Sequence, residues 1–252
     1  MIDIHCHILP NVDDGAGRLE DSLEMARAAV NEGINTIVAT PHHQNGRYNN
    51  PKSVVTKEVE TLNGELQKAG IPLTVLPGQE VRVYGELIED LQNGEIVPVG
   101  QYILVEFPAN HIPSFAEQLL FDIQTKGYVP IIVHPERNQV FIEQPDRLYK
   151  LVMNGACTQI TASSVIGRFG KNIQKFCKQL IESNLTHLIA SDAHNTTSRG
   201  FYLKDAYNYI DRQFGMDYVY MFRENAQQLI DGNHLHKEIP ERIKRKKFLG
   251  LF

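Results

Sequence analysis

Histidines and carboxylates recur at the ends of apolar segments along this chain. His5 and His7 are two residues apart, so on a strand both side chains lie on one face. Asp192 and His194 repeat that spacing near the other end of the chain. The remaining candidates follow the intervening apolar runs or the loops after them: Asp14, His42, Glu80, Glu106 and His134. Imidazole and carboxylate groups are common ligands of divalent metals, so the pattern predicts a metal site.

The number of candidates indicates more than one ion. A lone histidine at a strand end is usually a hydrogen-bonded core residue, and an isolated His-x-His pair often occurs by chance. Here five histidines and four carboxylates share the same position relative to apolar runs, and burying so many charges without a cation would be prohibitive. One ion cannot bind nine protein ligands, so two or three bridged ions are expected. With no thiolate in the set, manganese, iron, zinc or magnesium fits better than a soft metal.

Alternating segments must position these residues. Apolar runs predict strands, and most are apolar at nearly every residue, as in parallel strands covered on both faces. Helices are expected from Leu19 to Val30, ending at Gly33, and from Pro51 to about Gly70. The expected strands span residues 2–9, 34–40, 73–83, 103–107, 129–133, 157–162 and 185–190. This alternation predicts one α/β domain, either a doubly wound sheet or a (β/α) barrel, whose strand ends meet at one rim.

Bulk composition narrows the class of protein. The chain has 252 residues, 42% hydrophobic and 22% charged, as in ordinary globular proteins. A net charge of −5 argues against nucleic-acid binding, which needs a basic surface. No apolar run is long enough for a transmembrane segment, and the N-terminal residues lack a secretory signal pattern. Cys6, Cys157 and Cys177 are odd in number and widely spaced, so we expect no disulfide framework and a cytoplasmic location.

Two arginines follow predicted ligands closely. Arg137 comes three residues after His134, and Arg199 comes five residues after His194. Both therefore begin near the predicted rim, where a guanidinium can match two phosphate oxygens with its planar fork. An ordinary surface arginine, or a salt bridge from Arg137 to Glu136, is the alternative. We favour phosphate binding by Arg137 and Arg199, and assign them the catalytic role.

The motifs together resemble the polymerase and histidinol phosphatase (PHP) superfamily. The resemblance is closer to its bacterial protein-tyrosine phosphatase branch, which is encoded with capsule and exopolysaccharide genes. It covers nearly the whole chain, and no ligand position is missing. The motifs that carry it are His5-Cys6-His7, Asp14, Thr40-Pro41-His42, Gly78-Gln79-Glu80, Glu106, His134-Pro135-Glu136-Arg137 and Ser191-Asp192-Ala193-His194.

This resemblance implies a fold and a metal centre. The fold would be a distorted (β/α)7 TIM-like barrel over residues 1–243, followed by a basic and apolar tail, 244–252. The centre would hold three divalent ions, usually manganese. The implied ligand sets are His5, His7, Glu80 and Asp192 for one ion, Glu80, Glu106 and His134 for the second, and Asp14, His42 and His194 for the third.

The implied activity is a metal-dependent protein-tyrosine phosphatase. A metal-bridged hydroxide would attack phosphorus, while the ions, Arg137 and Arg199 hold the phosphoryl oxygens. The implied partner is a bacterial tyrosine kinase with a tyrosine-rich segment, so the activity would regulate capsule or exopolysaccharide synthesis.

Other functions share some of these features. A small-molecule phosphatase of the histidinol-phosphate type has the same ligands, and a non-enzymatic alternative is a metal-stabilised interaction module. A nuclease fits the negative charge poorly, and amidohydrolases usually carry a carboxylated lysine where this chain has Glu106. A cysteine-dependent phosphatase needs an arginine six positions after its cysteine, and this chain has Val12, Ser163 and Ser183 there.

Three further features lie outside the predicted metal site. The tail combines Lys244–Lys247 with the apolar residues 248–252, which is usual for a solvated end. Contact with an anionic membrane surface or a partner protein is the alternative. His234 and His236 form a second His-x-His pair, but a polar tail without further ligands follows, so we expect no metal there. His43 is expected to be exposed to solvent.

Overall fold

The apolar runs form strands, and the amphipathic segments between them form helices. The computed structural model describes residues 1–244. Within these residues the strands are β1 (Ile2–Cys6), β2 (Thr36–Ala39), β3 (His42–His43), β4 (Thr74–Pro77), β5 (Glu80–Arg82), β6 (Tyr102–Glu106), β7 (Val129–Val133), β8 (Cys157–Thr161) and β9 (Leu188–Ala190). The chain therefore has the alternating α/β architecture that the sequence predicts.

The helices follow the predicted apolar stripes. In the described part of the chain they are α1 (Leu19–Asn31), α2 (Lys52–Lys68), α3 (Leu87–Asn93), α4 (Ala116–Thr125), the 3-10 helix η1 (Pro135–Arg137), α5 (Gln139–Glu143), α6 (Pro145–Met153), α7 (Ala162–Val165), α8 (Lys171–Glu182), α9 (Leu203–Phe214) and α10 (Met216–Ile230). In α2, the residues Val55, Val59, Leu62 and Leu66 are buried at helical spacing. Both predicted early helices are confirmed.

The strands form two sheets, in the order β1-β2-β4 and β3-β5-β6-β7-β8-β9. Every strand pair within these sheets is parallel. The predicted strand 34–40 forms β2 and ends before Pro41, which has no N–H to donate; β3, in the other sheet, begins at His42. The predicted strand 73–83 is split between the two sheets, as β4 and β5. It breaks at Gln79, whose buried side chain accepts a hydrogen bond from Val97 N and donates one to Asn50 O, each 2.6 Å long. The fold is a single α/β domain with parallel sheets.

The first and last strands lie side by side. Cys6, at the end of β1, and Ala193, just after β9, form an isolated parallel bridge. His7 N donates to Ala193 O, and Asp192 N donates to His5 O, each at 2.9 Å. The Asp3 carboxylate accepts hydrogen bonds from the backbone N and the hydroxyl of Ser191. These contacts bring the two ends of the ligand pattern together.

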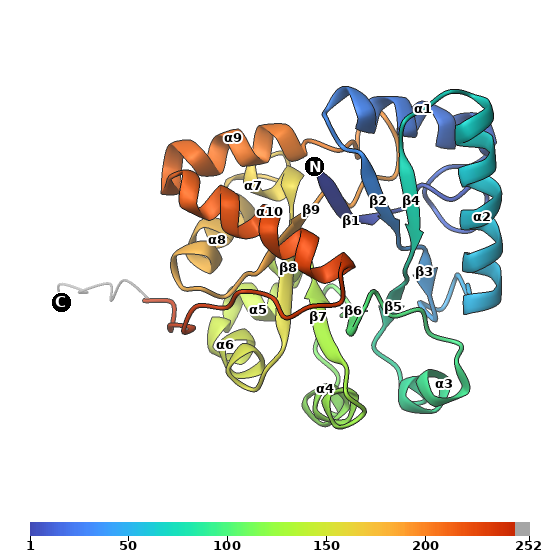
Figure 1. Ribbon diagram of the computed structural model, residues 1–252. Helices are drawn as coiled ribbons and strands as arrows, with labels where there is room; N and C mark the ends of the chain where they lie inside the picture. The colour runs from blue at the N-terminus through green and yellow to red at the C-terminus, as the bar shows by residue number, and fades with distance from the viewer. Residues whose placement is uncertain (245–252) are drawn as a thin grey trace, which may run out of the picture.

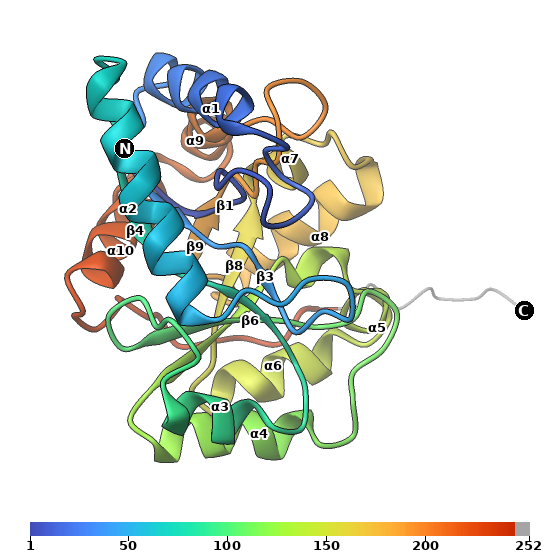
Figure 2. The same cartoon turned by 90° about the vertical axis from the view of Figure 1, so that its right-hand side faces the viewer.

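Helices surround the strands in both views (Figures 1 and 2). One apolar cluster lies between the strands and this helical layer. A second cluster, which we call the inner core, is formed by alternate strand residues such as Ile4, Leu104 and Ile131. Ala226 and Leu229 of α10 belong to the inner core as well. Along β6 the inward positions Tyr102 and Leu104 lead to Glu106, so alternation carries the inner face directly into the site.

A segment after α10 crosses the N-terminal ends of the strands. The Tyr102 hydroxyl, at the start of β6, donates to Asn233 O at 2.8 Å and accepts from Leu235 N at 3.0 Å. Leu235 is buried in the inner core. No helix within residues 1–244 is both long and apolar enough to cross a bilayer. Of the predicted tail, Lys244 is exposed and residues 245–252 lie outside the described residues.

Replacing Tyr102 with phenylalanine should destabilise the fold without changing the site. The variant leaves Asn233 O without a donor and Leu235 N without an acceptor, which costs about 1–3 kcal/mol for buried polar groups. Chemical denaturation should show the loss, and Tyr220→Phe, at an exposed position, should show none. Wild-type stability in Tyr102→Phe would contradict the proposed role of this hydroxyl.

Candidate metal centre

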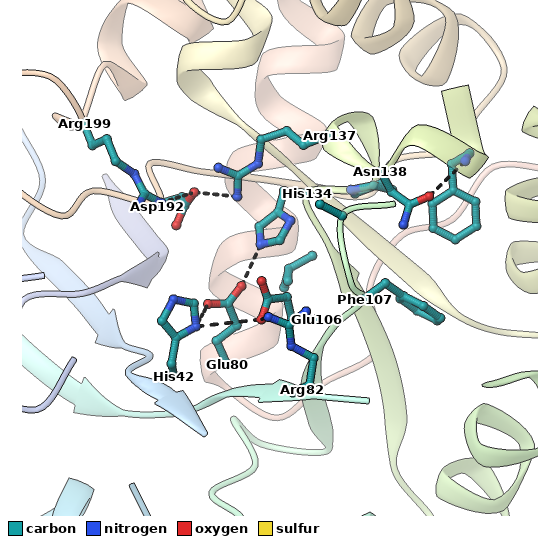
Figure 3. A pocket seen from close by; sticks show the side chains of 14 residues that line it. His42, Glu80, Arg82, Glu106, Phe107, His134, Arg137, Asn138, Asp192 and Arg199 are labelled. Atoms are coloured by element: carbon teal, nitrogen blue, oxygen red, sulfur yellow. Dashed lines mark hydrogen bonds and ion pairs between the residues drawn. The ribbon is translucent and has the colours of Figure 1, made fainter. Parts of the chain in front are cut away.

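The carboxylate of Glu80 lies at the centre of the converging strand ends (Figure 3). Its Oε1 is 2.6 Å from His134 Nε2, and its Oε2 is 2.7 Å from His42 Nδ1. The Nε2 atoms of His7 and His5 lie 3.5 and 3.7 Å from Oε2. Strand register explains the His42 contact, because His42 on β3 pairs with Glu80 on β5. One buried carboxylate therefore faces four imidazoles.

The two histidines of β1 face each other and a second carboxylate. His5 Nε2 and His7 Nε2 are 3.3 Å apart. Asp192 Oδ1 lies 3.5 Å from His5 Nε2 and 3.4 Å from His7 Nε2. Two imidazole nitrogens that converge on carboxylate oxygens form a donor set that suits a cation.

Asp14 joins the group from the loop after β1. Its Oδ1 lies 3.3 Å from His42 Nε2 and 3.4 Å from His194 Nε2. Glu106, at the end of β6, places its Oε2 3.8 Å from His42 Nδ1. The structure thus brings all nine predicted ligands into one cluster.

Three subsets have ligand atoms close enough to share an ion. All of the candidate metal-binding groups found in residues 1–244 belong to this cluster. The subsets are His7, Asp14, His42 and His194; His5, His7 and Glu80; and His42, Glu80 and Glu106. The second predicted histidine pair is elsewhere, because His236 is exposed beside Glu224.

Unpaired buried atoms test whether this cluster fits a metal. Within the described residues, the buried atoms without a hydrogen-bond partner include His42 Nδ1, Glu80 Oε2, Glu106 Oε2 and His194 Nε2. His42 Nδ1 and Glu80 Oε2 are close, but they lack hydrogen-bond geometry. Each unpaired buried group costs about 1–3 kcal/mol, and a coordinated cation would remove that cost. The nitrogen and oxygen donors fit divalent ions of the manganese, iron, zinc and magnesium group.

The same crowding shifts the pKa values of the cluster. Burial lowers the pKa of His7, but Asp13 outweighs this effect and raises it to about 9. Burial also opposes the charged form of His42, yet Glu80 and Asp14 raise its pKa to about 11. Burial and the charge of His7 lower the pKa of His194 to about 4. Burial and the charge of Glu80 raise the pKa of Glu106 to about 7.

Residues that the sequence analysis missed orient the predicted ligands. His7 Nδ1 donates to Asp13 Oδ2 at 2.6 Å, and the same oxygen accepts from His42 N at 3.1 Å. His5 Nδ1 donates to Gln159 Oε1 at 2.9 Å. Gln159 belongs to β8, the one predicted strand to which no ligand was assigned. Such contacts fix the ring orientation and leave the other nitrogen facing the metal position.

The loop that carries Asp13 and Asp14 packs directly on the end of β1. Ala16 N donates to His7 O at 3.2 Å, and Gly15 lies against the same residue. A Cβ atom at Gly15 would stand 2.0 Å from His7 O. Only glycine allows this approach, and Gly15 N also donates to Asp13 Oδ1 at 2.9 Å. The close packing holds Asp13 under His7.

Both predicted phosphate-binding arginines reach Asp192. The Nη2 atoms of Arg137 and Arg199 lie 2.7 and 3.2 Å from Asp192 Oδ2 (Figure 3). The other oxygen of this carboxylate, Oδ1, faces His5 and His7. The alternative partner of Arg137, Glu136, instead accepts from Thr161 N and Ser164 Oγ. Asp192 has φ 53°, a left-handed conformation that is uncommon outside glycine, although aspartate adopts it more readily than most residues.

A third arginine also enters the site. Arg82 NH2 lies 3.0 Å from Glu106 Oε2, because Arg82 on β5 pairs with Glu106 on β6. The signal was present in the sequence: Arg82 is two residues after Glu80 and shares its strand face. His43 differs from expectation, because it is buried and packs against Tyr84 on the side away from His42.

The three arginines and the metal cluster border one open pocket. Its volume is about 300 Å³. It is lined by His42, Glu80, Arg82, Glu106, Phe107, Ala109, Val133, His134, Pro135, Arg137, Asn138, Phe141, Asp192 and Arg199. The pocket places three arginine side chains beside the cluster of candidate metal ligands. It is therefore suited to a substrate that carries an anionic group.

Comparison with known proteins identifies the family. The family described as "Capsular polysaccharide synthesis, CpsB/CapC" matches residues 1–231. The chain belongs to this family. The predicted membership of the capsule-associated branch is therefore confirmed.

Relatives in the CpsB/CapC family match over their full length. The chain is 50% identical to the tyrosine-protein phosphatase YwqE of Bacillus subtilis and 42% identical to the putative tyrosine-protein phosphatase CapC of Staphylococcus aureus. Each alignment covers 100% of both proteins. A crystal structure from work on YwqE of B. subtilis and CpsB of Streptococcus pneumoniae, described as unique metal-dependent tyrosine phosphatases, has a TM-score of 0.95 at 50% identity. That match covers 97% of this chain and 100% of the other.

Asp13→Asn should weaken metal binding while the protein stays folded. When the asparagine oxygen keeps its bond to Gly15 N, the side-chain NH2 group faces His7 Nδ1 and cannot accept from it, so the ring tautomer is no longer held. We expect about 10- to 100-fold lower metal affinity by titration calorimetry. Asp205→Asn, at an exposed position of α9, is the matched control and should bind as wild type does. Equal affinities for wild type and Asp13→Asn would exclude the orienting role.

Metal binding at pH 7 should release about two to three protons, because His7 and His42, with pKa values of about 9 and 11, are protonated in the metal-free cluster and Glu106, with a pKa of about 7, is half protonated. His194, with a pKa of about 4, is already neutral and should release none. Metal affinity should therefore rise with pH through the neutral range. Calorimetry in buffers of different ionisation enthalpy measures the count, and a binding heat independent of the buffer would contradict it.

Proposed function

We propose that this protein is a metal-dependent tyrosine phosphatase. The observation that carries the proposal is the pairing of Arg137 and Arg199 on Asp192, directly beside the metal cluster and within an open pocket. Full-length identity of 50% to a tyrosine-protein phosphatase supports the same activity. A phosphoryl group in this pocket would meet guanidinium groups on one side and the metal cluster on the other.

The chain's own residues would bind and orient the phosphoryl group. Arg137 and Arg199 each offer planar N–H donors that match phosphate oxygens, and Asp192 holds both guanidiniums toward the pocket. Fixed donors of this kind stabilise the charge of the transition state without rearranging during the reaction. Phe107 and Pro135 form apolar lining beside these groups, which suits an aryl substituent.

The metal centre is proposed to hold three divalent ions, most simply manganese. His5, His7, Glu80 and Asp192 would hold one, Glu80, Glu106 and His134 the second, and Asp14, His42 and His194 the third. The unpaired buried atoms of these side chains support this assignment. When bound, the ions supply Lewis acidity, which produces a nucleophile from water at neutral pH and neutralises phosphoryl charge.

Few groups in the pocket lining could protonate the leaving group. The carboxylates that line the pocket are Glu80, Glu106 and Asp192, and all three are proposed ligands. The departing oxygen must then leave as an anion, so the rate depends on its basicity. A tyrosine phenolate, whose conjugate acid has a pKa of about 10, leaves far more easily than a serine alkoxide. The site should therefore favour phosphotyrosine through chemistry as well as binding.

The proposed setting is the cytoplasm, where the protein would act on an autophosphorylating tyrosine kinase with a tyrosine-rich segment. Such an activity would regulate capsule or exopolysaccharide synthesis, which the family description supports. The three cysteines are free and buried, in keeping with a reducing compartment. For the tail, 244–252, a solvated end stays the prediction, with contact to an anionic membrane surface or a partner protein as the alternative.

The finer architecture is proposed as a distorted (β/α)7 barrel over residues 1–243. The segments β2 with β3 and β4 with β5 each count as one interrupted strand, which gives seven. The Cys6–Ala193 bridge supports closure between the first and last of them.

The test is phosphatase activity after metal removal. Chelated and dialysed protein should be inactive, and manganese should restore hydrolysis of a phosphotyrosine peptide. In single-turnover reactions a matched phosphoserine peptide should react at least about 100-fold more slowly, which is the usual scale of general acid catalysis. Comparable rates on the two peptides would show that a general acid operates.

Parallel reactions separate the alternatives. Faster turnover of histidinol phosphate than of the phosphotyrosine peptide would assign the site to a small-molecule phosphatase. Inactivity toward every phosphate ester, with metal bound, would favour an interaction module. Alkylating reagents should leave the rate unchanged, because burial raises the pKa of the Cys6 and Cys177 thiols.

A further inference from the structure

Two consecutive side chains in the loop between α7 and α8 contact the two segments that carry the phosphate-binding arginines. Phe169 lies against Arg137, and Arg168 lies against Tyr202 at the end of the Arg199 loop. We propose that Arg168 and Phe169, here called the clasp, are positioning residues that hold Arg137 and Arg199 ready for phosphate. This inference rests on the proposed function and assigns a role to residues outside the pocket lining.

A second fixed point is needed because both guanidiniums share one oxygen atom. Arg137 and Arg199 each contact Asp192 Oδ2, at 2.7 and 3.2 Å. Two like charges at one acceptor repel each other, and the single ion pair of Arg137 leaves its planar group free to pivot. Arg199 has one further, longer ion pair, from Nη1 to Asp14 Oδ2 at 3.7 Å. Phosphate recognition by a guanidinium depends on the orientation of its plane. Asp192 alone therefore cannot define both planes.

Phe169 supplies the second contact for Arg137. The Arg137 Cζ atom lies 5.7 Å from the centre of the Phe169 ring. The ring face attracts a cation, and the attraction strengthens where water is excluded, as around the mostly buried Arg137 side chain. The Arg137 guanidinium therefore has two contacts: an ion pair with Asp192 and the ring of Phe169.

Arg168 acts on the Arg199 loop through Tyr202. The Arg168 Cζ atom is 4.2 Å from the centre of the Tyr202 ring, and the Tyr202 hydroxyl donates to Thr197 O at 3.1 Å. Within the same loop, Asn195 Oδ1 accepts from Arg199 N at 3.0 Å. Tyr202 has φ 53°, which is rare for a bulky residue and requires support from its surroundings. Arg168 provides part of that support.

The backbone allows the two neighbouring side chains to serve separate loops. Gly167 and Gly170, on either side of the clasp, have φ values of 87° and 98°. Arg168 N donates to Ser163 O at 2.9 Å, and Gly170 N donates to Gly167 O at 3.0 Å. The clasp is therefore a short turn tied back to α7. Helix α7 packs against α9, beside the segment that precedes α9 (Figure 2).

The experiment measures inorganic phosphate affinity of the manganese-loaded full chain by calorimetry, together with kcat and KM for p-nitrophenyl phosphate. Phe169→Ala should weaken phosphate binding and lower kcat/KM about tenfold, as expected for loss of a cation–π contact to the mostly buried Arg137 side chain. Arg168→Ala should lower both about two- to fivefold, because Arg168 is exposed and such contacts are weaker there. Phe169→Tyr keeps the aromatic face and should restore affinity. Phe169→Leu keeps apolar volume without that face, so it should lose affinity as alanine does. Phe121→Ala and Arg27→Ala, at exposed positions, are matched controls and should behave as wild type.

Combined variants distinguish positioning from general destabilisation. Phe169→Ala should add no loss of phosphate affinity in an Arg137→Ala background, yet keep its full effect in an Arg199→Ala background. Arg168→Ala should show the reverse pattern, because it acts through the Arg199 loop. Should an alanine variant fail to fold, the Phe169→Leu and Arg168→Gln variants, which also remove the ring face or the cation, carry the same comparison.

The outcomes separate this proposal from the one it rests on. A wild-type protein without phosphatase activity overturns the proposed function. An active wild type whose Phe169 and Arg168 variants bind phosphate normally overturns the clasp. Equal losses in both arginine backgrounds overturn it as well, since they would reflect a general change in the fold.

Discussion

The buried carboxylate of Glu80 sets the conditions for the rest of this structure. It lies among four imidazoles from three other strands or strand ends, with His134 and His42 nearest. The residues around it must supply charge balance, hold the rings at fixed angles and keep water out. Asp13 and Gln159 serve the second need through single hydrogen bonds to His7 and His5. The inner core below Glu80 serves the third. Removing any of these supports would leave charged groups buried without compensation.

Asp192 connects the two halves of the chemistry. One carboxylate oxygen faces His5 and His7, and the other accepts Arg137 and Arg199. The proposed metal and phosphate sites would thereby be linked through a single side chain, whose backbone is in the left-handed conformation. A change at either set of partners must be felt by the other, because a carboxylate cannot rotate toward one without leaving the other.

Sequence patterns predicted the parts of the site that repeat with strand periodicity. The two-residue spacing predicts the pairs His5 with His7 and Asp192 with His194. The ends of apolar runs predict Glu80 and Glu106. The interruptions at Pro41 and Gln79 were missed, because Gln79 turns outward to bind the backbone of Asn50 and Val97, far away in sequence. Asp13 and Gln159 were missed for the same reason: their roles exist only once distant segments meet. His43 was wrongly expected in solvent, because adjacent residues on β3 face opposite sides.

The seam between β1 and β9 has a consequence for how the protein is made. Asp3 and Ser191, which meet there, are 188 positions apart in the chain. During translation His5 and His7 leave the ribosome first. Asp192 and His194 follow only when most of the chain has been synthesised. Such distant pairing makes the centre one of the last features to form. A shortened nascent chain carries only fragments of the ligand set, so tight metal uptake marks a chain whose translation has passed its final strand.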